Sequence, residues 1–423
     1  MTTHADSVPP EVIVDVDHHS DDFNLHEVDR WAEIRHTCPV TYNPRHGGFW
    51  MVTSYDAVLE VARDSDTYAH QFERDAPDGV DYYGIYGIPR PDGMPALGIG
   101  EVDGIYHQEL RRALNPFLSP PAVEELRPYM QQSVTWFLDQ KVEDGEIDLV
   151  LEYTSPVPAM LTMRMLGLPL TDWRLYADLF HAVNSYPIDS EEYQRARAPI
   201  DDMRGNLAVF AAARKANPKA DLTSFLVQLE VNGAPLTDTQ ILDVLWNLIG
   251  GGVDTTTSLT SWTLFFLAQH PELRQQLIDR PELDVSATEE FLRYFSVAQT
   301  LSRTITRDVT LGGQQLRRND RLLMSWLSAN HDETKFDSPD EVLLDRPMNR
   351  HLAFGLGPHR CIGSHLARAI FAISVREILR RIPDYEVDAG RVRQYLGHPA
   401  ITGIVDLPAT FTPGRIVGAP RPY

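Results

Sequence analysis

Residues 354–363 read Phe-Gly-Leu-Gly-Pro-His-Arg-Cys-Ile-Gly, a glycine-rich stretch that carries one of the chain's two cysteines. An amphipathic pattern over residues 363–382 follows directly and predicts a helix. Cys361 is therefore expected just before a helix N-terminus, where partial positive charge and unpaired N–H groups stabilise a thiolate. The glycines at 355 and 357 let the backbone approach a flat ligand closely. These features predict a ligand site centred on Cys361.

Three alternatives compete with a functional cysteine. A lone cysteine without further context is more often an inert buried thiol. A dinucleotide-binding loop needs a third glycine in Gly-x-Gly-x-x-Gly, and Arg360 stands at that position. A zinc site from His359, Cys361 and His365 has the wrong ligand spacing and lacks a fourth ligand. The last two alternatives can be set aside, whereas the first depends on the rest of the chain.

The stretch resembles the signature of the cytochrome P-450 family, the haem-thiolate monooxygenases. The family pattern is Phe-Gly-x-Gly-x-His/Arg-x-Cys-x-Gly, and every fixed position matches. The resemblance implies haem b (iron protoporphyrin IX), with Cys361 as the axial iron ligand and His359 hydrogen-bonded to a haem propionate. Phe354, Gly355 and Gly363 complete the implied cofactor-binding loop. A thiolate ligand pushes electron density onto the iron and favours O–O cleavage.

A second motif lies in a helix predicted over residues 286–295. Glu290 and Arg293 are three positions apart and therefore project from one helix face. Such a pair alone is more often solvated at a surface. Upstream of the cysteine loop it resembles the family's Glu-x-x-Arg motif, which Arg346 would complete from an irregular segment. The resemblance implies a structural role, which is to hold the loop that carries Cys361.

Residues 241–268 form a long apolar stretch whose only charges are Asp243 and Asp254. Its length exceeds the roughly 20 residues that cross a bilayer. However, the glycines at 250–252, then Asp254 and a Thr/Ser run, interrupt it near the middle, and an aspartate is costly to bury in lipid. We therefore expect a long helix through a protein core and no membrane anchor.

Within that helix, residues 251–256 read Gly-Gly-Val-Asp-Thr-Thr and resemble the family's oxygen-activation motif. The resemblance gives Thr255 a hydrogen bond to dioxygen and Asp254 a role in proton relay, so both are candidate catalytic residues. A buried threonine that caps a kinked helix is the alternative for an isolated Asp-Thr pair. A carboxyl group inside an apolar helix favours the functional interpretation.

Cations for the two haem carboxylates are also present. His107 and Arg111 have the i, i+4 spacing that places two side chains on one side of a helix. Arg303 lies ten positions after Arg293 and matches the family's strand arginine. The resemblance assigns all three to the propionates. Together with His359 they form a charge-assisted set of four donors.

The rest of the chain indicates the architecture. Helical patterns dominate over residues 106–278, whereas residues 303–327 and 383–423 look like short strands and turns. The expected fold class is therefore mainly α with small β sheets (α+β). The resemblance implies the cytochrome P-450 fold, with haem buried between a long central helix and the cysteine loop. A single haem-thiolate monooxygenase domain is expected over residues 1–423, with residues 1–40 as a partly irregular N-terminal extension.

The candidate substrate pocket is inferred by position within that fold. Residues 76–104 form a long glycine-rich loop whose tyrosines suggest that it covers something. Most of the residues inferred to line the pocket are apolar or aromatic, which fits a lipophilic substrate. They are Tyr82, Tyr83, Tyr86, Leu248, Gly251, Val297 and Val405.

Composition excludes several classes of protein. Lys and Arg total 38 against 60 Asp and Glu, a formal net charge of −22 that repels nucleic-acid phosphate. An apolar fraction of 43% is too high for a disordered chain, and two cysteines cannot build a disulfide scaffold. The N-terminus has neither a basic start nor an apolar core, so it does not resemble a secretory signal and we expect a cytoplasmic protein. We also expect a monomer.

No segment resembles a flavin, nicotinamide or iron–sulfur site, so electrons are expected from a separate ferredoxin or flavodoxin. Arg112, Arg360 and Arg368 would lie on the cysteine side of the haem and form a basic patch for that acidic partner.

The function implied is a monooxygenase that hydroxylates or epoxidises a lipophilic small molecule with O₂ and two electrons. The alternatives are a peroxide-driven haem-thiolate peroxygenase and a non-catalytic haem sensor or carrier. Peroxide users often lack the acid–alcohol pair that Asp254 and Thr255 form here.

Overall fold

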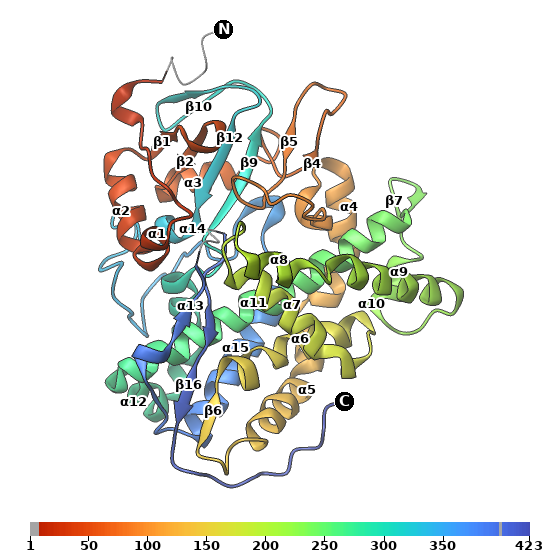
Figure 1. Ribbon diagram of the computed structural model, residues 1–423, viewed down its shortest axis with the longest axis vertical. Helices are drawn as coiled ribbons and strands as arrows, with labels where there is room; N and C mark the ends of the chain where they lie inside the picture. The colour runs from red at the N-terminus through yellow and green to blue at the C-terminus, as the bar shows by residue number, and fades with distance from the viewer. Residues whose placement is uncertain (1–7, 397–399) are drawn as a thin grey trace.

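The computed structural model describes residues 8–396 and 400–423 as a mainly helical protein with several small sheets (Figure 1), the fold class expected from the sequence. The helices are α1 (Asp21–Leu25), α2 (Glu27–Thr37), α3 (Tyr55–Arg63), α4 (Gly104–Leu114), α5 (Pro120–Asp139), α6 (Pro156–Leu166), α7 (Trp173–Ser185), α8 (Glu191–Arg197), α9 (Ile200–Ala216), α10 (Leu222–Leu226), α11 (Asp238–Gln269), α12 (Pro271–Asp279), α13 (Asp284–Phe295), α14 (Trp326–Asn330) and α15 (Ser364–Arg381).

The largest sheet has five strands in the order β1-β2-β12-β9-β3. Strands β2 and β12 are parallel, and the other neighbours are antiparallel. Its strands are β1 (Val40–Asn43), β2 (Phe49–Val52), β3 (Tyr68–Ala69), β9 (Thr300–Ile305) and β12 (Arg321–Ser325). Alternate side chains enter two different apolar clusters, since Trp50 and Leu322 belong to one and Met51 and Leu323 to the other. Both faces of the sheet are therefore covered.

The remaining strands form a three-stranded sheet, β13-β16-β6, and four two-stranded pairs. They are β4 (Phe72–Glu73), β5 (Tyr82–Tyr83), β6 (Glu146–Asp148), β7 (Glu230–Val231), β8 (Ala234–Pro235), β10 (Val309–Leu311), β11 (Gln314–Leu316), β13 (Glu386–Val387), β14 (Arg393–Gln394), β15 (Ile404–Asp406) and β16 (Pro408–Thr410).

The central helix α11 begins at a capping box. The Thr237 hydroxyl accepts from the Gln240 amide at 3.2 Å, and the Gln240 side chain accepts from the Thr237 amide at 2.9 Å. The helix then continues through the glycines at 250–252 without a break. Although α11 has 32 residues, no helix in the described part of the chain is long and apolar enough to cross a membrane.

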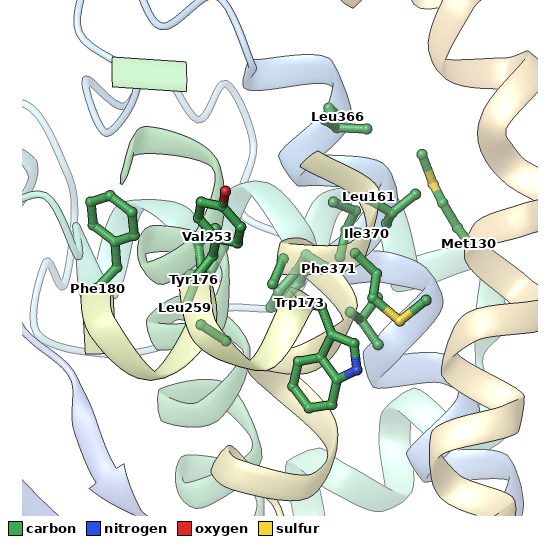
Figure 2. Close-up of a cluster of buried hydrophobic side chains, with 14 of the residues drawn as sticks. Met130, Leu161, Trp173, Tyr176, Phe180, Val253, Leu259, Leu366, Ile370 and Phe371 are labelled. Carbon is green, nitrogen blue, oxygen red and sulfur yellow. The ribbon is translucent and has the colours of Figure 1, made fainter. Parts of the chain in front are cut away.

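The main apolar core lies where α11 packs against α6, α7 and α15, and where α5 in turn packs against α6 and α15. Figure 2 shows side chains from these five helices converging on one region. Two of the glycines of α11 permit this packing. A Cβ at Gly250 would lie 2.9 Å from the Phe180 ring, and one at Gly252 would lie 2.6 Å from the Thr162 hydroxyl. The glycines therefore bring α7 and α6 close to the central helix, while the helix stays regular.

Candidate active site

A cavity of about 330 Å³ lies between α11 and the loop that carries Cys361. Its wall also takes residues from α4, β9 and α15. Most of the wall is apolar, and its apolar members include Ile85, Ile99, Leu118, Met165, Leu248, Leu259, Leu292, Val297, Leu301, Trp326, Phe354 and Leu366. The cysteine loop and the central helix, more than 90 positions apart in the chain, thus face one shared space.

Cys361 lies three residues before the start of α15, and its amide donates to the Phe354 carbonyl at 2.8 Å. This bond closes the loop on itself. Glycine is required at 355 and 357, where φ is +64° and +75°. A Cβ at Gly357 would also lie 2.3 Å from the Ala62 carbonyl oxygen. The loop is therefore fixed in position against α3.

The Cys361 side chain is exposed to the cavity. Burial raises the pKa of its thiol, while the Gly363 amide and the guanidinium groups of Arg111, Arg360 and Arg368 act in the opposite direction. The expected thiolate-stabilising groups are present, but the protein that encloses the cavity outweighs them and keeps the pKa of the thiol above its ordinary value.

All four predicted propionate partners line the cavity: His107, Arg111, Arg303 and His359. His359 Nε2 donates to Asp103 Oδ1 at 2.9 Å. Its ring is stacked between the rings of His70, at 3.5 Å, and His107, at 3.8 Å. Burial lowers the pKa of His107 to about 4 and the pKa of Arg303 to about 9. Arg303 therefore stays cationic at neutral pH although it is buried, whereas the His107 ring is neutral there.

Unsatisfied donors in this cluster fit an anionic ligand. Among the described residues, the buried side-chain atoms that lack a hydrogen-bond partner include Nε2 of His107, both ring nitrogens of His70 and Nε of Arg303. Native proteins rarely leave such groups unpaired. A ligand with two carboxylates on the edge of a flat apolar body would satisfy these donors and fill the cavity. The residues present therefore fit a haem.

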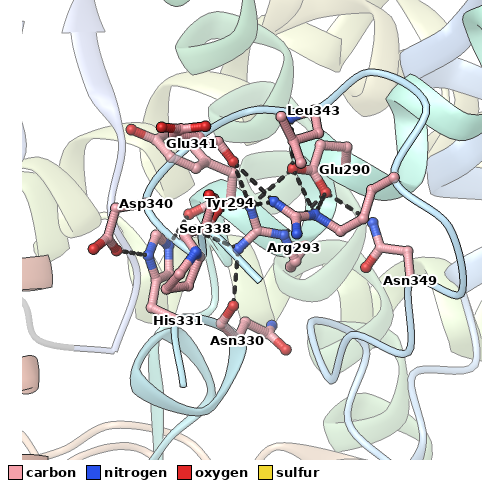
Figure 3. A network of polar contacts seen from close by, with 12 residues as sticks. Glu290, Arg293, Tyr294, Asn330, His331, Ser338, Asp340, Glu341, Leu343 and Asn349 are labelled. Carbon is pink, nitrogen blue, oxygen red and sulfur yellow. Dashed lines mark hydrogen bonds and ion pairs between the residues drawn. The ribbon is translucent and has the colours of Figure 1, made fainter. Parts of the chain in front are cut away.

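Glu290, Arg293 and Arg346 form a buried triad, of which Figure 3 labels Glu290 and Arg293. Glu290 accepts from Arg293 Nε at 2.9 Å and Nη2 at 2.8 Å, and from Arg346 Nε at 2.9 Å. Burial alone would raise the pKa of Glu290, but the two arginines outweigh it and lower that pKa. The Leu343 amide and the Asn349 side chain also donate to Glu290, so the triad fixes the irregular segment before the cysteine loop.

Thr255 and Gly251 face the cavity from α11. The Thr255 hydroxyl donates to the Gly251 carbonyl at 3.0 Å, one helical turn back. A Cβ at Gly251 would meet no atom within 4 Å, unlike one at Gly250 or Gly252. Gly251 is therefore the glycine that leaves open space beside the helix.

Asp254, by contrast, does not line the cavity and is buried on another side of α11. Its Oδ2 accepts from Asn184 Nδ2 at 2.8 Å, and its Oδ1 accepts from the Tyr395 hydroxyl at 2.9 Å. His181 Nδ1 lies 2.8 Å from the same hydroxyl, and its Nε2 donates to the Val405 carbonyl at 2.8 Å. Burial lowers the pKa of His181, but Asp254 more than offsets this, so the net pKa is raised.

The structure separates the residues expected in the substrate pocket into two groups. Leu248, Gly251 and Val297 line the cavity. The others do not line it, because each is held by a different contact. Tyr82 donates to Asp78 at 2.8 Å, Tyr83 lies under the Arg74 guanidinium at 4.1 Å, Tyr86 contacts Asn184 at 3.4 Å, and Val405 holds His181 through its carbonyl. The glycine-rich loop instead contributes Ile85, Ile99 and Gly100.

Two residues of the site were not found from the sequence. Asp103 accepts from the amides of His70 and Gln71, at 2.7 and 2.9 Å, as well as from His359. Burial acts to raise the pKa of Asp103, but the hydrogen bond from His359 and the nearby His70 ring, whose Nδ1 lies 3.6 Å from Asp103 Oδ1, lower that pKa far below the usual value. Neither Asp103 nor His70 belongs to a local pattern, so no signal in the sequence identified them.

Comparison with known proteins places this geometry in a family. The chain is 31% identical over 361 residues to the mycinamicin IV hydroxylase/epoxidase of Micromonospora griseorubida, with 84% of this chain and 87% of the relative covered. It is 33% identical over 340 residues to the nocardicin C N-oxygenase of Nocardia uniformis, with 79% and 82% covered.

A solved structure of the Mycobacterium marinum cytochrome P-450 CYP268A2 in complex with pseudoionone superposes with a TM-score of 0.86. It is 26% identical, and the match covers 96% of this chain and 100% of that chain. The family profile described as cytochrome P-450 matches residues 163–383, which include α11, the buried triad and the cysteine loop. This chain therefore belongs to the cytochrome P-450 family of haem-iron monooxygenases.

Proposed function

We propose that this monooxygenase binds haem b and hydroxylates or epoxidises a lipophilic small molecule, using O₂ and two electrons from a separate ferredoxin or flavodoxin. The observation that carries the proposal is the largely apolar cavity that Cys361 and Thr255 share. When bound through the Cys361 thiolate, haem supplies the activation of dioxygen. His107, Arg111, Arg303 and His359 would hold its carboxylates.

We assign the distal proton chemistry to Thr255 and Asp254 in separate roles. The Thr255 hydroxyl lines the cavity and would orient dioxygen and hold a proton next to it. Asp254 is turned toward Tyr395 and Asn184, so a proton on its carboxyl group reaches the cavity only after those bonds open. Asn184 and Tyr395 would thus control how readily Asp254 supplies protons.

The orientation of Asp254 is the one observation that favours the alternative, a peroxide-driven peroxygenase. One experiment separates the two functions. Haem-loaded protein is supplied either with NAD(P)H, a reductase and a ferredoxin, or with hydrogen peroxide alone. Product formed faster with the electron system supports the monooxygenase, and product formed only with peroxide supports the alternative.

The same preparation tests the individual roles. Cys361→Ser is expected to lose the red-shifted Soret band of the reduced carbonyl complex. Thr255→Ala is expected to divert NAD(P)H use toward hydrogen peroxide, and fully coupled turnover would contradict its role. A screen of a compound library for the low-to-high-spin shift identifies the substrate class.

We also propose that Arg112 and Arg360, both exposed, form the basic patch for the electron donor. Arg368 is half-buried, pairs with Glu289 at 2.6 Å and packs on Phe354, so it contributes less free charge. Charge reversal at Arg112 is expected to slow electron transfer and weaken its salt dependence. The matched control is Arg195→Glu, a charge reversal on the exposed side chain in α8, which is expected to leave the rate unchanged.

A further inference from the structure

The largely apolar wall of the cavity contains one carboxamide among the residues that the structure describes, that of Asn247 on α11. The residue is half-buried. Within the described part of the chain its amide group forms no hydrogen bond, and neither of its polar atoms is enclosed by protein. The side chain therefore presents a hydrogen-bond donor and an acceptor to the open space of the cavity.

Asn247 lies on the face of α11 that borders the reaction site. Asn247, Gly251 and Thr255 follow one another at four-residue spacing, and all three line the cavity. Residues at this spacing share one face of a helix and are about 6 Å apart along its axis. Asn247 is thus about 12 Å from Thr255 along the helix, and Gly251 leaves open space between them. A ligand held at Asn247 would extend along this face toward Thr255.

The glycine-rich loop packs on the same part of α11. A Cβ at Gly98 would lie 2.4 Å from the Asp243 carbonyl oxygen, so the loop touches the backbone of the helix. A Cβ at Gly100 would lie 3.5 Å from both Asn247 Nδ2 and Ile85 Cδ1. Gly100 has no side chain and that of Ile85 is apolar, so neither side chain can hydrogen-bond the amide. The polar group of Asn247 is left for a ligand.

A buried ion pair fixes the loop in this position. The Glu101 side chain is fully buried, accepts from the amides of Ile85 and Leu97, both at 2.8 Å, and pairs with Arg90. Arg90 also donates to the Pro95 carbonyl at 2.9 Å. The pair therefore holds several points of the loop together, and the space beside the Asn247 amide is preorganised.

The charges of the wall indicate that the complementary ligand group is neutral. The described residues that line the cavity include no carboxylate, so the wall offers no counter-charge to a cationic ligand group. Its arginines, Arg111, Arg303 and Arg360, belong to α4, β9 and the cysteine loop, and none of them to α11 or the glycine-rich loop. A carboxamide suits a neutral oxygen, since it donates to a carbonyl and accepts from a hydroxyl.

We propose that Asn247 anchors the substrate through a neutral ketone, ester or hydroxyl oxygen, so that the enzyme selects lipophilic molecules that already carry an oxygen group over pure hydrocarbons. The inference rests on the proposed function, because it concerns the substrate of the same cavity. A hydrocarbon that fills the cavity takes water away from the amide and leaves it unpaired, whereas an oxygenated ligand replaces that water. A site that hydrogen-bonds a substrate group rejects analogues lacking that group more strongly than an apolar pocket distinguishes small differences in size.

The test compares matched probes on the haem-loaded full chain. Cyclododecanone is paired with cyclododecane and menthone with menthane, so the members of each pair share a carbon skeleton and differ at a carbonyl group. The Kd of each probe is measured by the low-to-high-spin shift and by calorimetry, for the unchanged protein and for Asn247→Leu. Leucine keeps the branching of the asparagine side chain but cannot hydrogen-bond. Because a change in shape acts on both members of a pair, the ratio of their Kd values isolates the hydrogen bond.

We expect Asn247→Leu to reduce the preference for the ketone over the hydrocarbon about tenfold, while haem content and the red-shifted Soret band stay unchanged. The matched control is Asn217→Leu, at the exposed residue that follows α9, which is expected to keep the preference of the unchanged protein. A preference that Asn247→Leu leaves unchanged within about twofold, or a loss of haem from that variant, would overturn the proposal. The ratios are measured without turnover, so a chain that binds ketones through Asn247 but forms no product with either electrons or peroxide would refute the proposed function alone.

Discussion

Replacing Glu290 with glutamine tests whether the buried triad holds the cysteine loop. The glutamine keeps the shape of the side chain but removes the charge shared by Arg293 and Arg346, and one of its two terminal atoms becomes a donor that faces a guanidinium. At least two charge-assisted hydrogen bonds are lost, each contributing about 1.5–3 kcal/mol. Breaking a buried ion pair costs about 3–5 kcal/mol.

Backbone carbonyls favour the lower end of that range. Arg293 still donates to the carbonyls of Asn330, Pro339 and Glu341, and Arg346 still donates to three carbonyls of the same irregular segment. We therefore expect Glu290→Gln to lower the free energy of unfolding by about 3 kcal/mol, a factor of roughly 150 in the folding equilibrium. The cysteine loop is expected to loosen, so haem content should fall as well.

The assay is urea unfolding followed by circular dichroism, combined with haem content and the Soret band of the reduced carbonyl complex. Glu282→Gln is the control, because Glu282 is an exposed surface residue paired with Arg280, and its change is expected to stay within about 0.5 kcal/mol. If Glu290→Gln loses less than about 1 kcal/mol and retains haem like the control, the triad does not hold the loop and the reasoning is refuted.

Three further predictions follow from individual side chains. Gly251→Leu is expected to raise the Kd of a bulky spin-shifting ligand at least about tenfold with little loss of stability, because its side chain enters open space. Gly252→Leu should lower the free energy of unfolding by about 1–3 kcal/mol, because its side chain meets Thr162. Similar unfolding midpoints for the two variants would contradict this prediction. Burial raises the pKa of Glu289, but its cationic partners outweigh this and lower the pKa to about 2. The stability that this shift contributes is present above pH 4.5 and is lost as the pH falls toward 2. The unfolding free energies of the unchanged protein and Glu289→Gln should therefore differ by at most about 3 kcal/mol at pH 7, and by less at pH 3. Asp254 raises the pKa of His181 above 6.5, so the stability from this interaction is present below pH 6.5 and is lost as the pH rises through the raised value. A His181→Gln variant whose unfolding midpoint has the same pH dependence as the unchanged protein would count against the interaction.

Local patterns predicted the elements that carry the chemistry. The predicted helices over residues 286–295 and 363–382 match α13 and α15 within two residues at each end, and the apolar stretch over 241–268 lies wholly within α11. These predictions succeeded because each element carries its own periodicity or its own glycine-rich turn. The long helix expected through this stretch is continuous across residues 250–252, where its glycines serve packing and open space.

The direction in which a side chain points from its helix or loop was harder to predict. Asp254 and Thr255 are adjacent in sequence, but one α-helical step turns them to different sides of α11, and the partners of Asp254 come from α7 and from residue 395. The tyrosines of the glycine-rich loop were expected in the pocket, yet their hydroxyls and rings find partners elsewhere, and Ile85 from the same loop lines the cavity.

Two features could be predicted from short stretches of sequence, each within about ten neighbouring residues: a cysteine at a glycine-rich turn before a helix, and an Asp-Thr pair in a long apolar helix. The side chains that surround them could not be predicted in this way, because they come from distant parts of the chain. Asp103 reaches His359 across 256 positions, and Gly100 lies beside Asn247 in the wall of the cavity. Such contacts depend on how finished elements pack together, and the free energy of that packing is distributed over the whole core rather than encoded in any short stretch.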